Sequence, residues 1–213
     1  MPARFVIRDF VKDGYYHIYN SSHEGQLLFR EEADYTLFLY YLSVYLSPIE
    51  KLLKKHPDVP VRLYHKNLSR ELTLFAYSLQ PDHFHLLIKQ DTPTAVPLFM
   101  KQLANAYMQY VTTKYRQRGS LFQGRYKAAR IIDPKQLVPL SRHLHYEPVL
   151  EKLGSLEYPW SSYQEYTGLS TRNLCEIKTI LSFFPSVYAY KKYHQDTKGY
   201  QKSLEKISPI LIE

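Results

Sequence analysis

The 213-residue chain carries a net charge of +8 at pH 7, and 45% of its residues are hydrophobic. A chain of this length and hydrophobicity can bury a core, which excludes a largely disordered protein. It holds no apolar run of about 18 residues, so no membrane span is expected, and its first residues lack the apolar segment of a secretory signal. The single cysteine, Cys175, excludes a disulfide framework and a thiolate zinc site, and predicts a reducing, cytoplasmic location. The positive charge favours a polyanionic partner.

The first elements along the chain are a strand and a helix. Residues 14–20 alternate well enough to predict a strand that places His17 on the same face as Tyr15 and Tyr19. From residue 31 to 46, apolar residues recur at three- and four-residue spacings, which predicts a helix that Pro48 ends or bends. A further short strand is expected over residues 61–64.

A stretch with two histidines follows, with the sequence YSLQPDHFHLLI over residues 77–88. Its β-prone apolar content predicts a strand. Because side chains alternate between the two faces of a strand, His83 and His85 share one face, while Phe84 and Leu86 point into a core. Two neighbouring imidazoles are suited to binding a divalent metal ion. The alternative is a pair of surface histidines on a half-exposed strand.

The next region is basic throughout. A long helix is predicted over residues 95–116, and a strand over 121–132. Between Thr92 and Ile132 there is no acidic residue, and the basic residues number seven: Lys101, Lys114, Arg116, Arg118, Arg125, Lys127 and Arg130. A solvated surface normally mixes charges of both signs, so we predict that these residues, with His17, bind nucleic-acid phosphates. The alternative is a helix that is basic without binding anything.

A third helix is predicted from Asp133 and Pro134, an N-cap followed by a first-turn proline, to a stop before Pro148. An interior Pro139 delays its regular part to about residue 138. Within this helix His143 and Glu147 lie four residues apart, on one face. With the two histidines opposite, they form a plausible metal constellation, and a surface ion pair is the alternative.

Beyond residue 168 the sequence predicts a helix over 176–184 and a tail that interleaves lysines with tyrosines. The tail, residues 188–206, contains Lys191, Lys192, Lys198, Lys202 and Lys206, with Tyr190, Tyr193 and Tyr200 between them. This composition suits contact with a nucleic-acid backbone plus base stacking. A solvated, partly helical tail is the alternative.

Five segments in one order carry a family resemblance. They read YHIYN, QPDHFHLL, GSLFQGRYK, RHLHYEPV and YPWSSY, and they begin at residues 16, 80, 119, 142 and 158. With these segments the chain resembles the single-tyrosine transposases of the HUH nuclease class, which include the REP-associated tyrosine transposases. The resemblance covers about residues 14–168.

The resemblance implies an α+β fold, a ferredoxin-like antiparallel sheet flanked by helices, for residues 1–168. We expect residues 169–213 to form a helical, basic C-terminal extension. The resemblance also implies a homodimer that binds hairpin-forming single-stranded DNA, with no membrane involved. His83 and His85 would be ligands of Mg²⁺ or Mn²⁺, which polarises the scissile phosphate.

Two positions depart from the family pattern. His143 stands where the family usually carries its nucleophilic tyrosine, and Glu147 stands where it carries an asparagine near the metal. A carboxylate is the better ligand for a hard cation, so Glu147 is expected to complete the metal site. An imidazole cannot reproduce a phenolate attack, and Tyr146 lies three residues along. We therefore expect DNA and metal binding with impaired strand cleavage.

Several other interpretations stay open. The protein could cleave and transfer strands through a relocated nucleophile, Tyr146 or His143. It could be a non-cleaving DNA-binding protein that keeps the fold and the basic groove. It could be a metal-dependent phosphodiesterase that uses water, with His143 as the general base. Finally, it could be a structural basic protein bound to RNA, with an incidental histidine pair.

Overall fold

The computed structural model describes residues 9–23, 25–117 and 119–211. Four strands, β1 (Tyr15–Ser21), β2 (Leu72–Leu79), β3 (His83–Gln90) and β4 (Lys127–Ile131), form one sheet in the order β2-β3-β1-β4. Every neighbouring pair is antiparallel. A long helix, followed by two short ones, lies between β1 and β2, and another long helix lies between β3 and β4, which gives the βαββαβ arrangement of a ferredoxin-like fold. The predicted α+β fold is confirmed.

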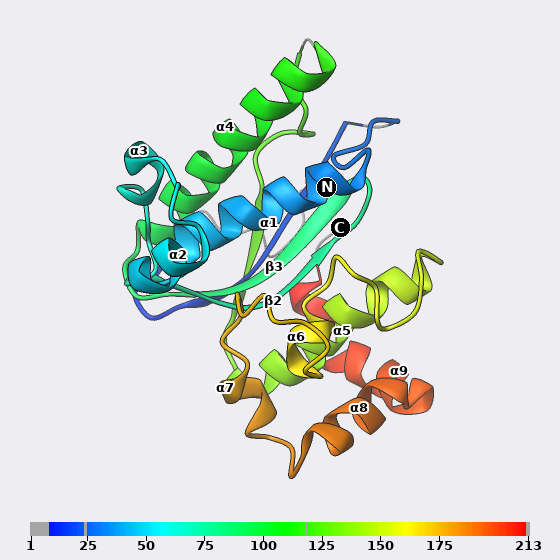
Figure 1. Ribbon diagram of the computed structural model, residues 1–213. Helices are drawn as coiled ribbons and strands as arrows, with labels where there is room; N and C mark the ends of the chain where they lie inside the picture. Colours follow the sequence, from blue (N-terminus) through cyan, green and yellow to red (C-terminus); the bar gives the residue numbers. More distant parts are fainter. Residues whose placement is uncertain (1–8, 24, 118, 212–213) are drawn as a thin grey trace.

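Helices α1 (Glu32–Leu46) and α4 (Ala95–Tyr115) cover one face of the sheet (Figure 1). Alternate residues of β1 and β3 point into the core on this side, which is apolar; the buried cluster includes Tyr16, Ile18, Phe84, Leu86, Ile88, Phe38, Leu42, Phe99 and Leu103. Two short helices, α2 (Ile49–Lys55) and α3 (Val61–Tyr64), follow α1. Three elements expected from the sequence, β1, α1 and α4, therefore form close to their predicted positions.

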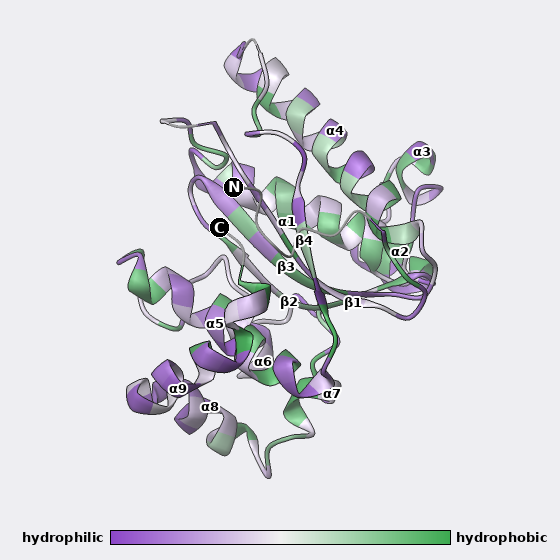
Figure 2. Cartoon of the chain, turned by 180° about the vertical axis from the view of Figure 1, so that it is seen from behind, coloured by the Kyte–Doolittle hydropathy of each residue, from purple (hydrophilic) through white to green (hydrophobic). Residues whose placement is uncertain are grey.

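The other face of the sheet is covered by the second half of the chain. Its elements are η1 (Pro134–Gln136), α5 (Leu137–Leu150), α6 (Tyr163–Tyr166), α7 (Lys178–Leu181), α8 (Val187–Gln195), α9 (Thr197–Ile207) and η2 (Ser208–Ile210). Tyr190, Ile207 and Ile210 share a buried cluster with Leu140 and Leu144 of α5. The C-terminal helices thus pack on α5, while their outer surfaces are hydrophilic (Figure 2). The domain boundary at residue 168 stays a prediction.

Two of the strands predicted from the sequence do not form as predicted. Residues 61–64 make a single helical turn after Pro60, in which the amide of Leu63 donates to the carbonyl of Pro60. The stretch 77–88 is the hairpin of β2 and β3 rather than one strand. Pro81 lies in the connecting turn, where its missing N–H removes no bond from the ladder. The amide of Gln80 donates to the carbonyl of His83 across this turn, at 2.8 Å.

Helix α5 runs through Pro148 to Leu150, although the sequence predicts that it ends before that proline. Pro148 lies in the last turn of the helix, and packing of the buried α5 face outweighs the one lost backbone bond. Pro139 falls in the first turn, where an amide needs no helical partner. Two other elements are shorter than predicted, since β4 begins only at Lys127 and α7 spans one turn. Among the described helices, none has the length and hydrophobicity that crossing a membrane requires.

Candidate metal centre and nucleic-acid interface

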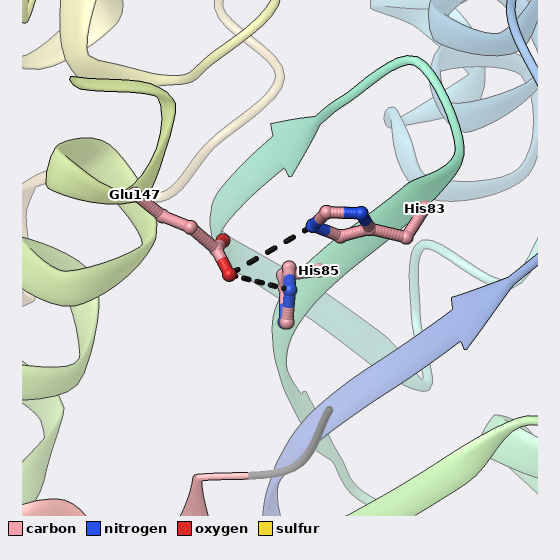
Figure 3. A group of neighbouring side chains, drawn as sticks. All are labelled: His83, His85 and Glu147. Atoms are coloured by element: carbon pink, nitrogen blue, oxygen red, sulfur yellow. Dashed lines mark ion pairs between the residues drawn. The ribbon is translucent and has the colours of Figure 1, made fainter. Parts of the chain in front are cut away.

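Two elements bring three metal-ligating side chains together between the sheet and α5. His83 and His85 project from one face of β3, and Glu147 points at them from α5 (Figure 3). Glu147 Oε1 lies 3.1 Å from His85 Nε2 and 3.8 Å from His83 Nε2. The potential ligand atoms of the three residues all lie within 4.8 Å of one another. The structure therefore assembles the side chains that the sequence nominates as ligands.

The donor atoms of this cluster fit a divalent cation. His85 Nε2 and Glu147 Oε2 are buried and make no hydrogen bond to any described residue. An unpartnered buried polar atom costs about 1–3 kcal/mol, and a bound cation would satisfy both atoms. His83 Nδ1 lies 2.7 Å from Asp82 Oδ1. Because a carboxylate only accepts, that nitrogen carries the proton and leaves the Nε2 lone pair for a metal.

The charges of the cluster also suit a cation. Burial acts most strongly on Glu147 and favours a higher pKa, but His85, His83 and His143 together hold its pKa well below the usual range. Glu147 is therefore ionised in the fold. Burial likewise favours a lower pKa for His83, and Glu147 and Asp82 outweigh it, so the pKa of His83 is raised. The Glu147 carboxylate therefore attracts positive charge to the cluster even when no metal ion is bound.

An open cleft of about 620 Å³ leads to this cluster. Tyr19, Pro81, Asp82 and Glu151 line it, together with His83 and Glu147. The rings of Tyr19 and His85 lie 4.8 Å apart, centroid to centroid. A phosphate group entering the cleft would therefore reach the side of the cluster where His83 is partly exposed.

The two predicted catalytic residues both contact α9. His143 is 5% exposed, and its Nδ1 lies 2.9 Å from the hydroxyl of Tyr200. Burial lowers the pKa of His143 to about 4. The ring of Tyr146 packs on Tyr200 at a centroid distance of 4.5 Å. No sequence pattern predicts these contacts, because they depend on how the C-terminal helices dock.

Two tyrosines of the tail do not have the exposure that base stacking needs. Tyr190 is fully buried, and Tyr200 is 2% exposed. Tyr190 packs on Tyr166 and His194, and its hydroxyl lies 3.0 Å from His145 Nδ1. The alternation of lysine and tyrosine in this segment reflects amphipathic helices that turn Tyr190 and Tyr200 inward.

The predicted phosphate-binding residues divide into several groups. Lys101 and Arg125 are exposed and line one cavity of about 500 Å³, beside Tyr126. Lys127 lies with its Nζ 5.0 Å from the centre of the Tyr19 ring, which borders the metal cleft. Lys127 therefore places positive charge beside the metal cleft, while Lys101 and Arg125 place it at a separate cavity on the α4 side.

The other members of that set lie elsewhere. Lys114 bonds to Glu31 and Asp34, at 2.5 and 2.7 Å, which neutralise its charge. Arg116 and Arg130 are exposed, and Arg116 adopts a left-handed backbone conformation just after α4. Arg118 lies outside the described residues. The structure places His17 in the interior, against His85.

Part of this chain matches a known protein family. Residues 55–138 match the model of the family described as IS200-like transposases. The predicted family resemblance is confirmed. The segment matching the IS200-like transposases contains both histidines and the basic region, and it ends just inside α5, before His143 and Glu147.

A search of curated proteins gives no match. Among solved structures, the chain is similar to a REP-associated tyrosine transposase bound to a REP hairpin. The two share 15% sequence identity with a TM-score of 0.47, over 78% of this chain and 88% of that one.

Proposed function

We propose that this protein is a transposase-like DNA-binding protein that acts on hairpin-forming single-stranded DNA with a divalent metal. The observation that carries this proposal is the cluster of His83, His85 and Glu147, in which two buried polar atoms have no hydrogen-bond partner. Both histidines lie in the segment that matches the IS200-like transposase model. A metal bound there supplies Lewis-acid polarisation of a phosphate oxygen. The three side chains bind and orient it, and two imidazoles beside one carboxylate favour Mn²⁺ over Mg²⁺.

The DNA would extend from the cleft past Lys127 to the basic residues of the cavity on the α4 side. Lys101, Arg125 and Lys127 can contact backbone phosphates, while Tyr19 and Tyr126 offer aromatic rings to unpaired bases. We further propose that the protein works as a homodimer in the cytoplasm, as the family resemblance and the single cysteine suggest. Sedimentation velocity at micromolar concentration tests the dimer.

Strand cleavage is proposed to be impaired, for two reasons. A general base is most effective when its pKa is close to the working pH, and a pKa of about 4 makes His143 neutral but a poor proton acceptor. Both His143 and Tyr146 also pack against Tyr200, which occupies the surface that a nucleophile on α5 would use. These contacts weigh against a relocated nucleophile and against a water-using phosphodiesterase.

The metal is tested by replacing both histidines of β3. His83→Ala with His85→Ala should abolish Mn²⁺ binding measured by electron paramagnetic resonance, while circular dichroism stays native. His65→Ala, at an exposed histidine far along the chain from the cluster, is the matched control and should bind as the native protein does. Undiminished Mn²⁺ affinity in the double variant would remove this site from consideration.

The state of strand cleavage is tested with an end-labelled hairpin oligonucleotide in Mn²⁺. The native protein should form no covalent adduct, His143→Tyr should form one, and His143→Phe should not. An adduct of the native protein that disappears with Tyr146→Phe would establish the relocated nucleophile. Turnover without an adduct would favour the phosphodiesterase, and tighter binding of duplex RNA than of the DNA hairpin would favour the RNA-binding alternative.

A further inference from the structure

His17 occupies a place in β1 that links the metal cluster to the end of the chain. It is fully buried, which keeps it out of reach of a bound nucleic acid. In the β1–β3 ladder His17 pairs with Leu87 and Tyr19 pairs with His85, so His17 and His85 are diagonal neighbours on one face. Their rings stack with centroids 5.0 Å apart. The short segment η2 packs next to β4.

Two hydrogen bonds fix the direction of this link. His17 Nδ1 lies 2.8 Å from the carbonyl oxygen of Ile210, and His17 Nε2 lies 2.8 Å from His85 Nδ1. A carbonyl can only accept, so His17 Nδ1 carries a proton. In the neutral ring Nε2 then has a lone pair, and it accepts the proton of His85 Nδ1. His85 therefore keeps a proton on Nδ1, and Nε2, the atom that faces Glu147, is the nitrogen that it can offer to a metal ion.

The reverse proton arrangement would disable the cluster. If His17 donated from Nε2, His85 Nδ1 would have to accept, and a neutral His85 would carry its proton on Nε2. A protonated nitrogen cannot bind a metal ion. A free neutral imidazole can adopt either tautomer, so a partner that accepts at Nδ1 favours the form of His85 that can bind a metal ion at Nε2.

We propose that His17, anchored by the carbonyl of Ile210, is a positioning residue that holds His85 in its metal-binding tautomer. The C-terminal segment thereby takes part in the metal centre, although it supplies no ligand. On β3 Asp82 serves His83 in the same way, from the neighbouring position in the chain. This proposal rests on the proposed metal site.

The test compares two substitutions of His17 in the full-length protein. His17→Phe keeps a flat ring but has no acceptor, and it should weaken Mn²⁺ binding by about 10- to 100-fold, the usual effect of losing such a partner. His17→Gln keeps an acceptor oxygen near the position of Nε2, so its Mn²⁺ affinity should stay within a few-fold of native. Native affinity in His17→Phe, or equal losses in both variants, would overturn the proposal.

A second measurement does not depend on the variants folding or on a metal. In the metal-free native protein labelled with ¹⁵N-histidine, the ¹⁵N spectrum should show a proton on His85 Nδ1, whether or not Nε2 shares a second proton with Glu147. A His85 ring whose Nδ1 carries no proton would refute the role of His17. If the native protein binds no Mn²⁺ but shows the proton on His85 Nδ1, the metal site fails and the hydrogen-bonded chain stands.

Discussion

The two faces of the sheet are made by the same strands and differ in nearly every respect. On β1 and β3, the residues Tyr16, Ile18, Phe84 and Leu86 enter an apolar core under α1 and α4. The residues between them include His17 and His85, which lie under α5. All five buried histidines of the described chain, His17, His85, His143, His145 and His194, belong to the α5 side.

This difference shows how one sheet separates stability from chemistry. The face under α1 and α4 is stabilised mainly by packing of apolar and aromatic side chains, and its buried carboxylate, Asp34, is satisfied by Lys114 and Tyr115. On the α5 face each buried imidazole needs a partner for both nitrogens, and unpartnered atoms remain where Glu147 meets His85. The apolar face therefore supports the fold, and the histidine face holds groups that a ligand can complete.

The largest expected effect comes from breaking the apolar face. Phe84→Ala should lower the free energy of unfolding by about 3–5 kcal/mol, since it removes a buried ring from the core next to His83 and His85. His85→Ala should instead remove Mn²⁺ binding with a smaller loss of stability. Urea unfolding and Mn²⁺ titration of both variants measure the two effects. Equal stability losses in the two variants would contradict the separation of the faces.

A smaller effect is expected on the pH dependence of stability, and it arises from the α5 face alone. Burial lowers the pKa of His194 to about 3, from an ordinary value of 6.5. Below pH 6.5 the unfolded chain binds a proton at this residue and the folded protein does not, so stability falls as pH decreases from 6.5 towards 3. At pH 5 the loss from one such histidine is about 2 kcal/mol. Urea unfolding at pH 7 and pH 5 measures it.

The matched variant for this pH effect is His194→Phe, which removes the titrating group. It should flatten the dependence of stability on pH between 7 and 5 by about the contribution of one histidine. Burial also holds the pKa of His145 well below its usual value, so part of the dependence should remain. An unchanged pH dependence in His194→Phe would mean that this histidine is protonated in the fold.

The smallest expected effect is on the salt dependence of DNA binding, and it tests whether Arg125 and Lys127 contact the phosphates. Arg125→Ala with Lys127→Ala should reduce the slope of log affinity against log salt for a hairpin oligonucleotide by about 1.4, since each phosphate contact on a single strand contributes about 0.7. Lys54→Ala with Lys66→Ala, at two exposed lysines elsewhere, should leave the slope unchanged. Equal slopes for both pairs would place the nucleic acid on another surface.

The sequence by itself determined the features that depend on local periodicity. Alternation along β3 puts His83 and His85 on one face and Phe84 on the other, because the side-chain period of a strand is fixed by its backbone. The spacing of apolar residues likewise set α1 and α4. The resemblance to IS200-like transposases rests on short segments of this kind, which can be read without knowing how they pack.

Only the tertiary structure decided which distant groups meet. Glu147 reaches the histidines because α5 docks on the sheet, and α5 continues through Pro148 because that docking outweighs a local helix-breaking preference. Tyr200 covers His143, and Ile210 reaches His17, 193 positions away in the chain. Contacts of this range follow from the shape of the whole core and from the partners that buried polar atoms require, and no local pattern in the sequence encodes either.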